Sequence, residues 1–476
     1  MPKTWKNAAA LCLTAAILTG CGAAPAEQPA AVSTSPAAAE PVMETAVPET
    51  AREVFQSQDG TVEFTLELQD IPKVQPMPIV EIQPHFITGQ DLERVGKVLL
   101  GDIDFYEREP QVGAKYAKAE IQKAIDTLEP LLTREAMEKT FGANTELVDL
   151  LPSFAQELKI LNEMLLEAPE ENSHVLCQWQ FQNWKHYNNF EQEPDAGFPV
   201  IFSTAELNGN EYLLTAAVDT GEEPKSILTC TMTTNLMDFQ LGRALYRAKY
   251  CSQKPTEEQV EAVLERAQDY LDRFELGQWT IDEWEITESP ADGDVRYTIF
   301  VHAAPVLEGY PAVSRFSFQE DPEMQDWYRD AYCYLEFAAG GELMDFDLSS
   351  PIASTRLVGE KQPVLPLQEL LDIGKDHLSK LSSMDGIGVW ADQLQNLQQE
   401  AGEEFTCKVQ IHTAKLALGR YLTKDGSYQY VPVFLLRGHT EYYGKDSGKL
   451  YLTSSEDGYE RSLLTVINAL DGTVIR

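Results

Sequence analysis

Six Asp-Gly pairs punctuate this chain and limit the folds that it can adopt. An Asp-Gly pair readily takes the left-handed turn conformation that a two-residue β-hairpin requires. The stretch 61–69 alternates apolar and polar residues strictly, which predicts a half-buried strand. Tight turns join antiparallel strands, whereas parallel strands need long crossovers, so antiparallel sheets are expected. The pairs begin at Asp59, Asp292, Asp385, Asp425, Asp457 and Asp471.

Helical patterns are interleaved with the strand patterns. Thr88 with Asp91, and Thr256 with Gln259, form capping-box signatures that open helices. Residues 88–168 are predicted to be mostly helical, and Gly340-Gly341 predicts a hairpin within 331–348. The expected fold class is therefore α+β, with antiparallel meanders and hairpins and packed helices.

The length predicts several units, because about 420 residues after the N-terminal region exceed what one core usually holds. We expect an N-terminal α+β domain over 55–250, followed by two blocks of helix plus antiparallel sheet over 251–350 and 351–476. Helix followed by meander recurs in 256–348 and 366–476. An internal duplication is one hypothesis for this order, although the two blocks share no residue-level identity.

The N-terminus has the three parts of a signal peptide. Lys3 and Lys6 form a basic start, an apolar run follows from Ala8 to Leu18, and small residues close the segment. The run of about 11 residues is too short to cross a bilayer, which needs about 20. No later stretch approaches 18 apolar residues.

The segment after the signal is predicted to be a disordered linker. Residues 22–53 are almost wholly Ala, Pro, Glu, Ser, Thr and Val, without aromatic residues or apolar periodicity. Such a composition cannot bury enough apolar surface to offset the entropy of ordering. As a flexible coil it would span on the order of 30 Å.

The residues Leu18-Thr19-Gly20-Cys21 resemble the lipobox of bacterial lipoproteins. The resemblance implies cleavage before Cys21, so that 1–20 is removed and 21–54 is the lipidated cysteine with its linker. It also implies a diacylglycerol on the Cys21 thiol, and two acyl chains anchor a protein stably. The expected location is the outer face of the bacterial cell membrane. The alternative is an ordinary secretory signal in which Cys21 is incidental.

A second resemblance lies at the end of the chain. Residues 430–436 and 464–475, which contain the Asp471-Gly472 turn, resemble the closing strands of PepSY-like domains, in which a helix packs on an antiparallel sheet. The whole layout is also similar to an uncharacterised family of Gram-positive bacterial lipoproteins. These resemblances imply fold and location and transfer no catalytic residue, so Asp471 is interpreted as a turn residue.

The charge balance restricts the partners. The chain has 76 acidic and 37 basic residues, a net charge of −39. Nucleic acid is excluded as a partner because its backbone needs Lys and Arg to neutralise it. The acidity is interpreted as a solvated surface, with capture of cations as the alternative.

Motifs for common chemistry are absent from the sequence. It has no H-E-x-x-H zinc motif, no G-x-S-x-G serine motif and no phosphate-binding loop. The five body cysteines are widely spaced without C-x-x-C, which favours isolated buried thiols. We therefore expect no metal, no cofactor and no catalytic residue. The cysteines are Cys177, Cys230, Cys251, Cys333 and Cys407.

Two patterns are weaker candidates for a site. Asp345-Phe346-Asp347 would place two carboxylates on one face of a strand, and Asp102-Ile103-Asp104 would do the same or form a turn. Trp279 and Trp284 are five residues apart, as are Trp179 and Trp184. That spacing puts the rings on opposite faces of a strand unless a bulge intervenes, so core packing is expected.

The leading functional hypothesis is a non-enzymatic binding or envelope-associated module, held to the membrane through lipidated Cys21. Peptides, glycans and envelope proteins are the expected classes of partner. The alternative is a surface-tethered hydrolase that acts on polysaccharide or peptide through residues distant in sequence.

Overall fold

The structure is a computed structural model, in which the chain divides into two units, Met1–Val47 and Pro48–Arg476. The described helices and strands all lie in the second unit. The described residues are 52–107, 116–142, 146–171, 175–184, 198–219, 225–233, 239–251, 253–291, 294–313, 331–385, 387, 391–422, 428–453 and 462–475.

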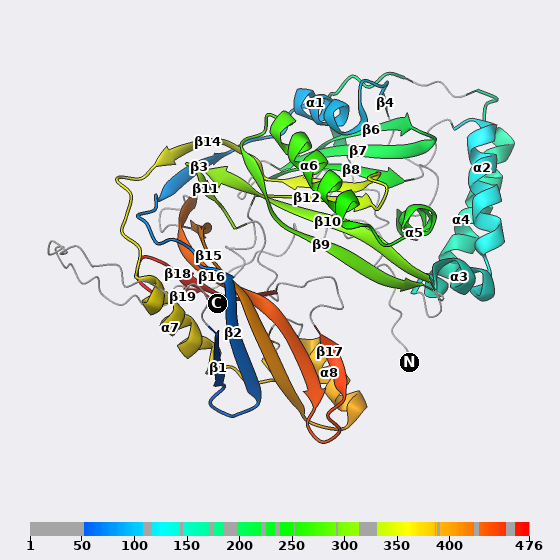
Figure 1. The fold of residues 1–476 in the computed structure, drawn as a ribbon. Helices are drawn as coiled ribbons and strands as arrows, with labels where there is room; N and C mark the ends of the chain where they lie inside the picture. Colours follow the sequence, from blue (N-terminus) through cyan, green and yellow to red (C-terminus); the bar gives the residue numbers. More distant parts are fainter. Residues whose placement is uncertain are drawn as a thin grey trace, which may run out of the picture. The chain divides into compact units, whose positions relative to one another are not determined.

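One sheet is formed by strands from both ends of the described chain, and we call it the terminal sheet. Its strand order is β1-β2-β15-β16-β18-β19, with β3 beside β14 and β16, and β17 beside β16. Strand β2 runs parallel to β15, whereas the other pairs are antiparallel. Figure 1 shows the early strands in blue next to the late strands in orange. The strands are β1 (Arg52–Gln56), β2 (Val62–Asp70), β3 (Val80–Pro84), β14 (Ile352–Leu357), β15 (Phe405–Leu422), β16 (Tyr428–Gly444), β17 (Leu450–Thr453), β18 (Ser462–Asn468) and β19 (Val474–Ile475).

The second sheet is built from the middle of the chain, and we call it the middle sheet. Its order is β11-β10-β12-β13-β8-β7-β6-β4, with β9 beside β10 and β5 beside β6, all antiparallel. The predicted hairpin within 331–348 is confirmed as β12 and β13. The strands are β4 (Tyr106–Glu107), β5 (Gln182–Trp184), β6 (Phe198–Leu207), β7 (Asn210–Asp219), β8 (Lys225–Thr233), β9 (Trp279–Ala291), β10 (Asp294–Leu307), β11 (Tyr310–Pro311), β12 (Tyr332–Ala338) and β13 (Leu343–Ser349).

The helices begin largely where their caps predict, and the fold class is α+β as expected. Both capping boxes are present, with Thr88 accepting from the amide of Asp91 and Thr256 from that of Gln259. No helix in the described ranges is long and apolar enough to cross a membrane. The helices are α1 (Gly89–Leu100), α2 (Lys118–Leu128), α3 (Arg134–Phe141), α4 (Leu151–Glu167), α5 (Phe239–Tyr250), α6 (Glu257–Arg273), α7 (Leu367–Leu378) and α8 (Ala391–Ala401), with 3-10 turns at Glu129–Leu131 and Glu146–Leu150.

The main core lies where α1 and α6 contact the middle sheet. Alternation in β12 buries Cys333, Leu335 and Phe337, and the helices add residues such as Leu92 and Val263. Gly96 permits close approach of α1, since a Cβ there would lie 2.6 Å from a Leu214 methyl carbon. The apolar residues that recur at helical spacing thus form the buried faces of α1 and α6.

Left-handed turns close several hairpins. Gly60 and Gly472, in two of the predicted Asp-Gly pairs, have φ of 72° and 78°. The other four pairs lie wholly or partly outside the described residues. In the Glu308-Gly309 pair between β10 and β11, both residues have positive φ, 51° for Glu308 and 83° for Gly309. Glutamate rarely adopts this conformation, so the tip of this hairpin is strained.

Buried charges join the two sheets. Asp282 is the extra residue of a β-bulge in β9, since Glu283 pairs with His302 and Ile281 with Ala303. Its carboxylate contacts Lys415 of β15 and Arg437 of β16, and Arg437 also contacts Glu283. The Asp282 and Arg437 side chains are only 1% and 5% exposed. We call these four residues, Asp282, Glu283, Lys415 and Arg437, the inter-sheet ion network.

Candidate functional site

The predicted lipidation residues, Leu18, Thr19, Gly20 and Cys21, lie outside the described residues. Lipidation therefore stays a prediction from sequence. His174 and His186, the closest pair of histidines in the sequence, also lie outside them.

Four of the five body cysteines are buried as the sequence predicts, and Cys177 is half-buried. Cys230, Cys251, Cys333 and Cys407 are buried. Burial raises the pKa of the thiols of Cys230 and Cys333 well above the ordinary value, and that of Cys407 to about 12. Burial likewise raises the pKa of half-buried Cys177. Since the thiolate is the reactive form, these four thiols are poor nucleophiles.

The carboxylates of Asp345 and Asp347 are held by hydroxyl groups of neighbouring strands. Asp345 accepts hydrogen bonds from Thr231 Oγ1 at 2.7 Å and Tyr334 OH at 2.9 Å. Tyr332 OH donates to Asp347 at 3.3 Å. Such bonds stabilise the ionised form of a carboxylate. We call Asp345, Asp347 and these three hydroxyl donors the acid–tyrosine cluster.

The remaining sequence candidates do not assemble into a site. Asp102 and Asp104 are exposed in the irregular segment after α1. The bulge at Asp282 places Trp279 and Trp284 on the same side of β9. They pair with Pro305 and Val301 of the neighbouring strand β10. Trp279 is nevertheless buried and donates to the Leu276 carbonyl, whereas Trp284 is exposed. The two rings therefore form no common platform.

His412 and His439 form a close pair across β15 and β16. Their facing ring nitrogens lie 2.8 Å apart and the ring centroids 4.8 Å apart. Within the described part of the chain, no group of three or more His, Cys, Asp or Glu residues could hold a metal ion. A hydrogen bond joins the two imidazoles.

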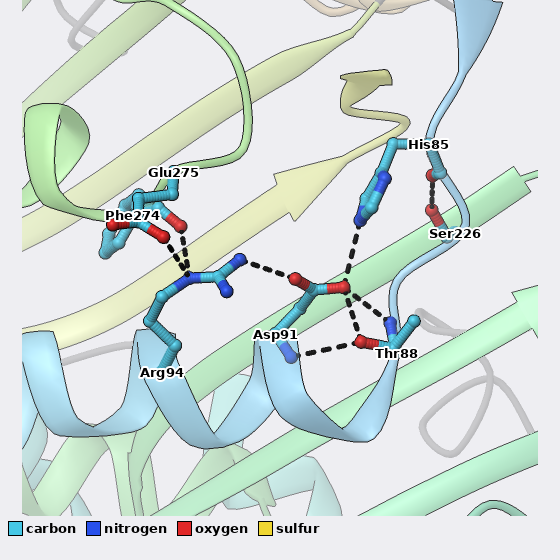
Figure 2. Close-up of polar contacts among 7 residues, drawn as sticks. All are labelled: His85, Thr88, Asp91, Arg94, Ser226, Phe274 and Glu275. Atoms are coloured by element: carbon cyan, nitrogen blue, oxygen red, sulfur yellow. Dashed lines mark hydrogen bonds and ion pairs between the residues drawn. The ribbon is translucent and has the colours of Figure 1, made fainter.

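Asp91 is the centre of a polar network at the start of α1 (Figure 2). Its carboxylate contacts the amide and hydroxyl of Thr88, His85 Nε2 at 2.9 Å and Arg94 Nη2 at 2.5 Å. Arg94 Nε donates to the Phe274 carbonyl at the C-terminal end of α6, at 2.8 Å. Ser226 of β8 donates to the His85 carbonyl. The network joins α1, α6 and the middle sheet, so its geometry indicates a structural role.

The pKa of Asp91 lies below its ordinary value. Burial alone would raise it, but hydrogen bonds from Thr88 and His85 favour the charged form and outweigh burial. Asp91 is therefore an ionised anchor rather than a proton donor at neutral pH.

A hollow of small-molecule size lies beside the Glu308-Gly309 turn, and we call it the turn pocket. Its volume is about 550 Å³, within the range of roughly 300–1,000 Å³ typical of small-molecule sites. Its walls come from the β2–β3 connection, the β10–β11 hairpin, the segment before α7, and β15. The lining residues are Pro72, Lys73, Gln75, Met77, Glu308, Gly309, Tyr310, Pro311, Lys361 and Leu416.

Backbone bonds fix the walls of the turn pocket relative to one another. Met77 and Gln362 exchange both backbone hydrogen bonds, at 3.0 and 2.8 Å. The Val313 amide donates to the Leu418 carbonyl, which fastens the hairpin of the middle sheet to β15 of the terminal sheet. The pocket is thus preformed by contacts that do not involve a ligand.

Tyr310 positions a lysine at the pocket wall. Lys361 Nζ donates to Tyr310 OH at 3.1 Å, and Tyr310 OH donates to the Pro76 carbonyl at 3.3 Å. Lys73, from a different segment, is the second cation in the lining. Sequence patterns missed this site because no local motif joins residues so far apart in the chain.

Comparisons with known proteins give no family for the chain. No protein-family model and no curated protein matches it. Among solved structures, the chain is similar to an uncharacterised protein from Eubacterium rectale, at 12% identity and a TM-score of 0.32. The similarity covers 90% of this chain and 94% of that protein.

Proposed function

We propose that this protein is a membrane-anchored extracytoplasmic lipoprotein whose body binds a small ligand in the turn pocket. The observation that carries the binding function is the pocket itself, a preformed hollow with converging polar and apolar groups. The anchoring part of the proposal rests on the signal peptide, the Cys21 lipobox and the linker in the sequence.

The lining suits binding by contact with both polar and apolar parts of a ligand. Met77 and Leu416 supply apolar surface, while Gln75 and the two lysines supply hydrogen-bond donors. Sites that bind small molecules commonly combine an apolar lining with a few such polar groups. Binding of a cell-surface component in the turn pocket would give the protein an envelope-associated role.

A pocket-filling variant tests the proposal. In a thermal-shift screen of peptides, sugars and organic acids, at least one compound should raise the melting temperature of the native chain. Gln75→Trp should abolish that shift, because the indole occupies the pocket. Gln75 is exposed, so the substitution should leave the unliganded melting temperature within a few degrees.

Gln399→Trp is the matched control, because it places the same ring on an exposed position of α8 outside the pocket. It should retain the ligand response. A shift that survives Gln75→Trp unchanged would contradict binding in the turn pocket.

A surface-tethered hydrolase remains the second candidate, and the acid–tyrosine cluster is the observation that favours it. Glycosidases need two carboxyl groups about 5–10 Å apart, and Asp345 and Asp347 lie on one face of β13. Turnover of a polysaccharide that Asp345→Asn abolishes and Gln75→Trp spares would favour this function instead.

A further inference from the structure

We infer that the ligand of the turn pocket carries an anionic group, carboxylate or phosphate, which Lys73 and Lys361 bind, on a body that lies against Tyr310. This inference rests on the proposed binding function and names the chemistry of its ligand.

The charge of the pocket lining differs from that of the whole chain. The chain carries 76 acidic and 37 basic residues, yet the lining contains two lysines and a single acidic residue, Glu308. An acidic protein repels anions over most of its surface, so a local cationic site determines where an anion can bind.

The one acidic residue of the lining is engaged elsewhere. Glu308 Oε1 accepts a hydrogen bond from Thr355 Oγ1 of β14 at 2.6 Å. In the part of the chain that the structure describes, neither Lys73 nor Lys361 has a carboxylate within 4.0 Å. Several other lysines, such as Lys97 and Lys380, do form such pairs. As far as the described residues go, the ammonium groups of the pocket are thus available for a ligand anion.

Lys361 is held in place before any ligand binds. Its Nζ lies 3.1 Å from Tyr310 OH and 5.0 Å from the centre of the ring. This contact leaves further N–H donors of the ammonium group for an anion, because an ammonium group has three. Holding the lysine in advance lowers the entropy lost when an anion binds.

The same tyrosine provides the contact for the rest of the ligand. The Tyr310 ring and Leu416 are half-buried, and Pro72 and Pro311 add apolar lining. A bare inorganic ion would use only the lysines. The pocket volume of about 550 Å³ accommodates an anion that carries a ring or a chain.

Paired probes test the inference on the full-length chain in non-ionic detergent. The pairs are 4-hydroxybenzoate with 4-hydroxybenzamide, and glucose 6-phosphate with glucose, measured by calorimetric titration. In at least one pair the anionic member should bind about tenfold or more tightly than its neutral analogue. Which pair responds distinguishes a carboxylate from a phosphate.

Substitutions connect the preference to the two lysines. Lys73→Gln and Lys361→Gln should each raise the Kd of the anionic probe about tenfold or more, as expected for loss of a charged hydrogen bond. Lys123→Gln, which removes an exposed lysine of α2 outside the pocket, should leave the Kd unchanged. Lys73→Arg should retain most of the binding.

The outcomes separate the inference from the proposed function. If neutral members bind as tightly as anionic ones and Gln75→Trp blocks both, the anion inference is overturned while binding in the pocket stands. If no probe shows binding that Gln75→Trp blocks, both are overturned.

Discussion

Replacing Asp282 by alanine should lower the free energy of unfolding by about 3 kcal/mol, the range measured when one partner of a buried ion pair is removed. The Asp282 side chain is 1% exposed and contacts both Lys415 and Arg437. Without its carboxylate, Arg437 keeps Glu283 as a partner but loses charge compensation in a position that is 5% exposed. Water does not restore that loss, because the site is buried.

The measurement is urea unfolding followed by circular dichroism. Asp269→Ala is the control, since Asp269 forms an exposed ion pair with Arg273 and should cost less than about 1 kcal/mol. The double variant Asp282→Leu with Arg437→Met should recover part of the loss, because apolar residues of similar volume replace buried ion pairs well. An Asp282→Ala loss no greater than that of Asp269→Ala would contradict a stabilising role for the inter-sheet ion network.

The second large effect is expected at Asp91. Asp91→Asn should lower the free energy of unfolding at pH 7 by about 2 kcal/mol, because it removes the charge that Thr88, His85 and Arg94 bind (Figure 2). The hydrogen bond from Arg94 to the Phe274 carbonyl at the C-terminal end of α6 would weaken as well, because Asp91 orients the guanidinium group that donates it.

The Asp91 effect should depend on pH in a defined direction. The pKa of Asp91 is lowered on folding, so its contribution is fully present above the unfolded pKa, about 3.9. It is lost as the pH falls through the lower folded value. The difference between native chain and Asp91→Asn should therefore be constant from pH 7 to about 5 and shrink below about pH 4. A difference that grows as the pH falls below 4 would contradict the assignment.

Local features of the fold could be predicted from sequence because their causes are local. The capping boxes at Thr88 and Thr256 involve residues three apart, and the Gly340-Gly341 pair placed the β12–β13 hairpin correctly. The pairing of β2 with β15 was not predicted, because parallel strands far apart in the chain leave no local signal. The bulge at Asp282 was also missed, since it depends on the partner strand.

The candidate site was harder to predict than the fold. The sequence singled out Asp345 and Asp347 because their spacing has a known chemical meaning, and the structure gives them hydroxyl partners from other strands. Lys73 and Lys361 had no such signal. In the sequence each is an ordinary surface lysine. Only in the fold does the β10–β11 hairpin place Tyr310 between the segments that carry them.

The proposed lipid anchor on Cys21 can be examined by mass spectrometry of the N-terminus of the mature native chain. The first residue should be Cys21 with a diacylglycerol on its sulfur, and Cys21→Ala should lose the lipid and appear in the medium. A native chain that begins at another residue, or a Cys21→Ala variant that stays in the membrane fraction, would contradict it.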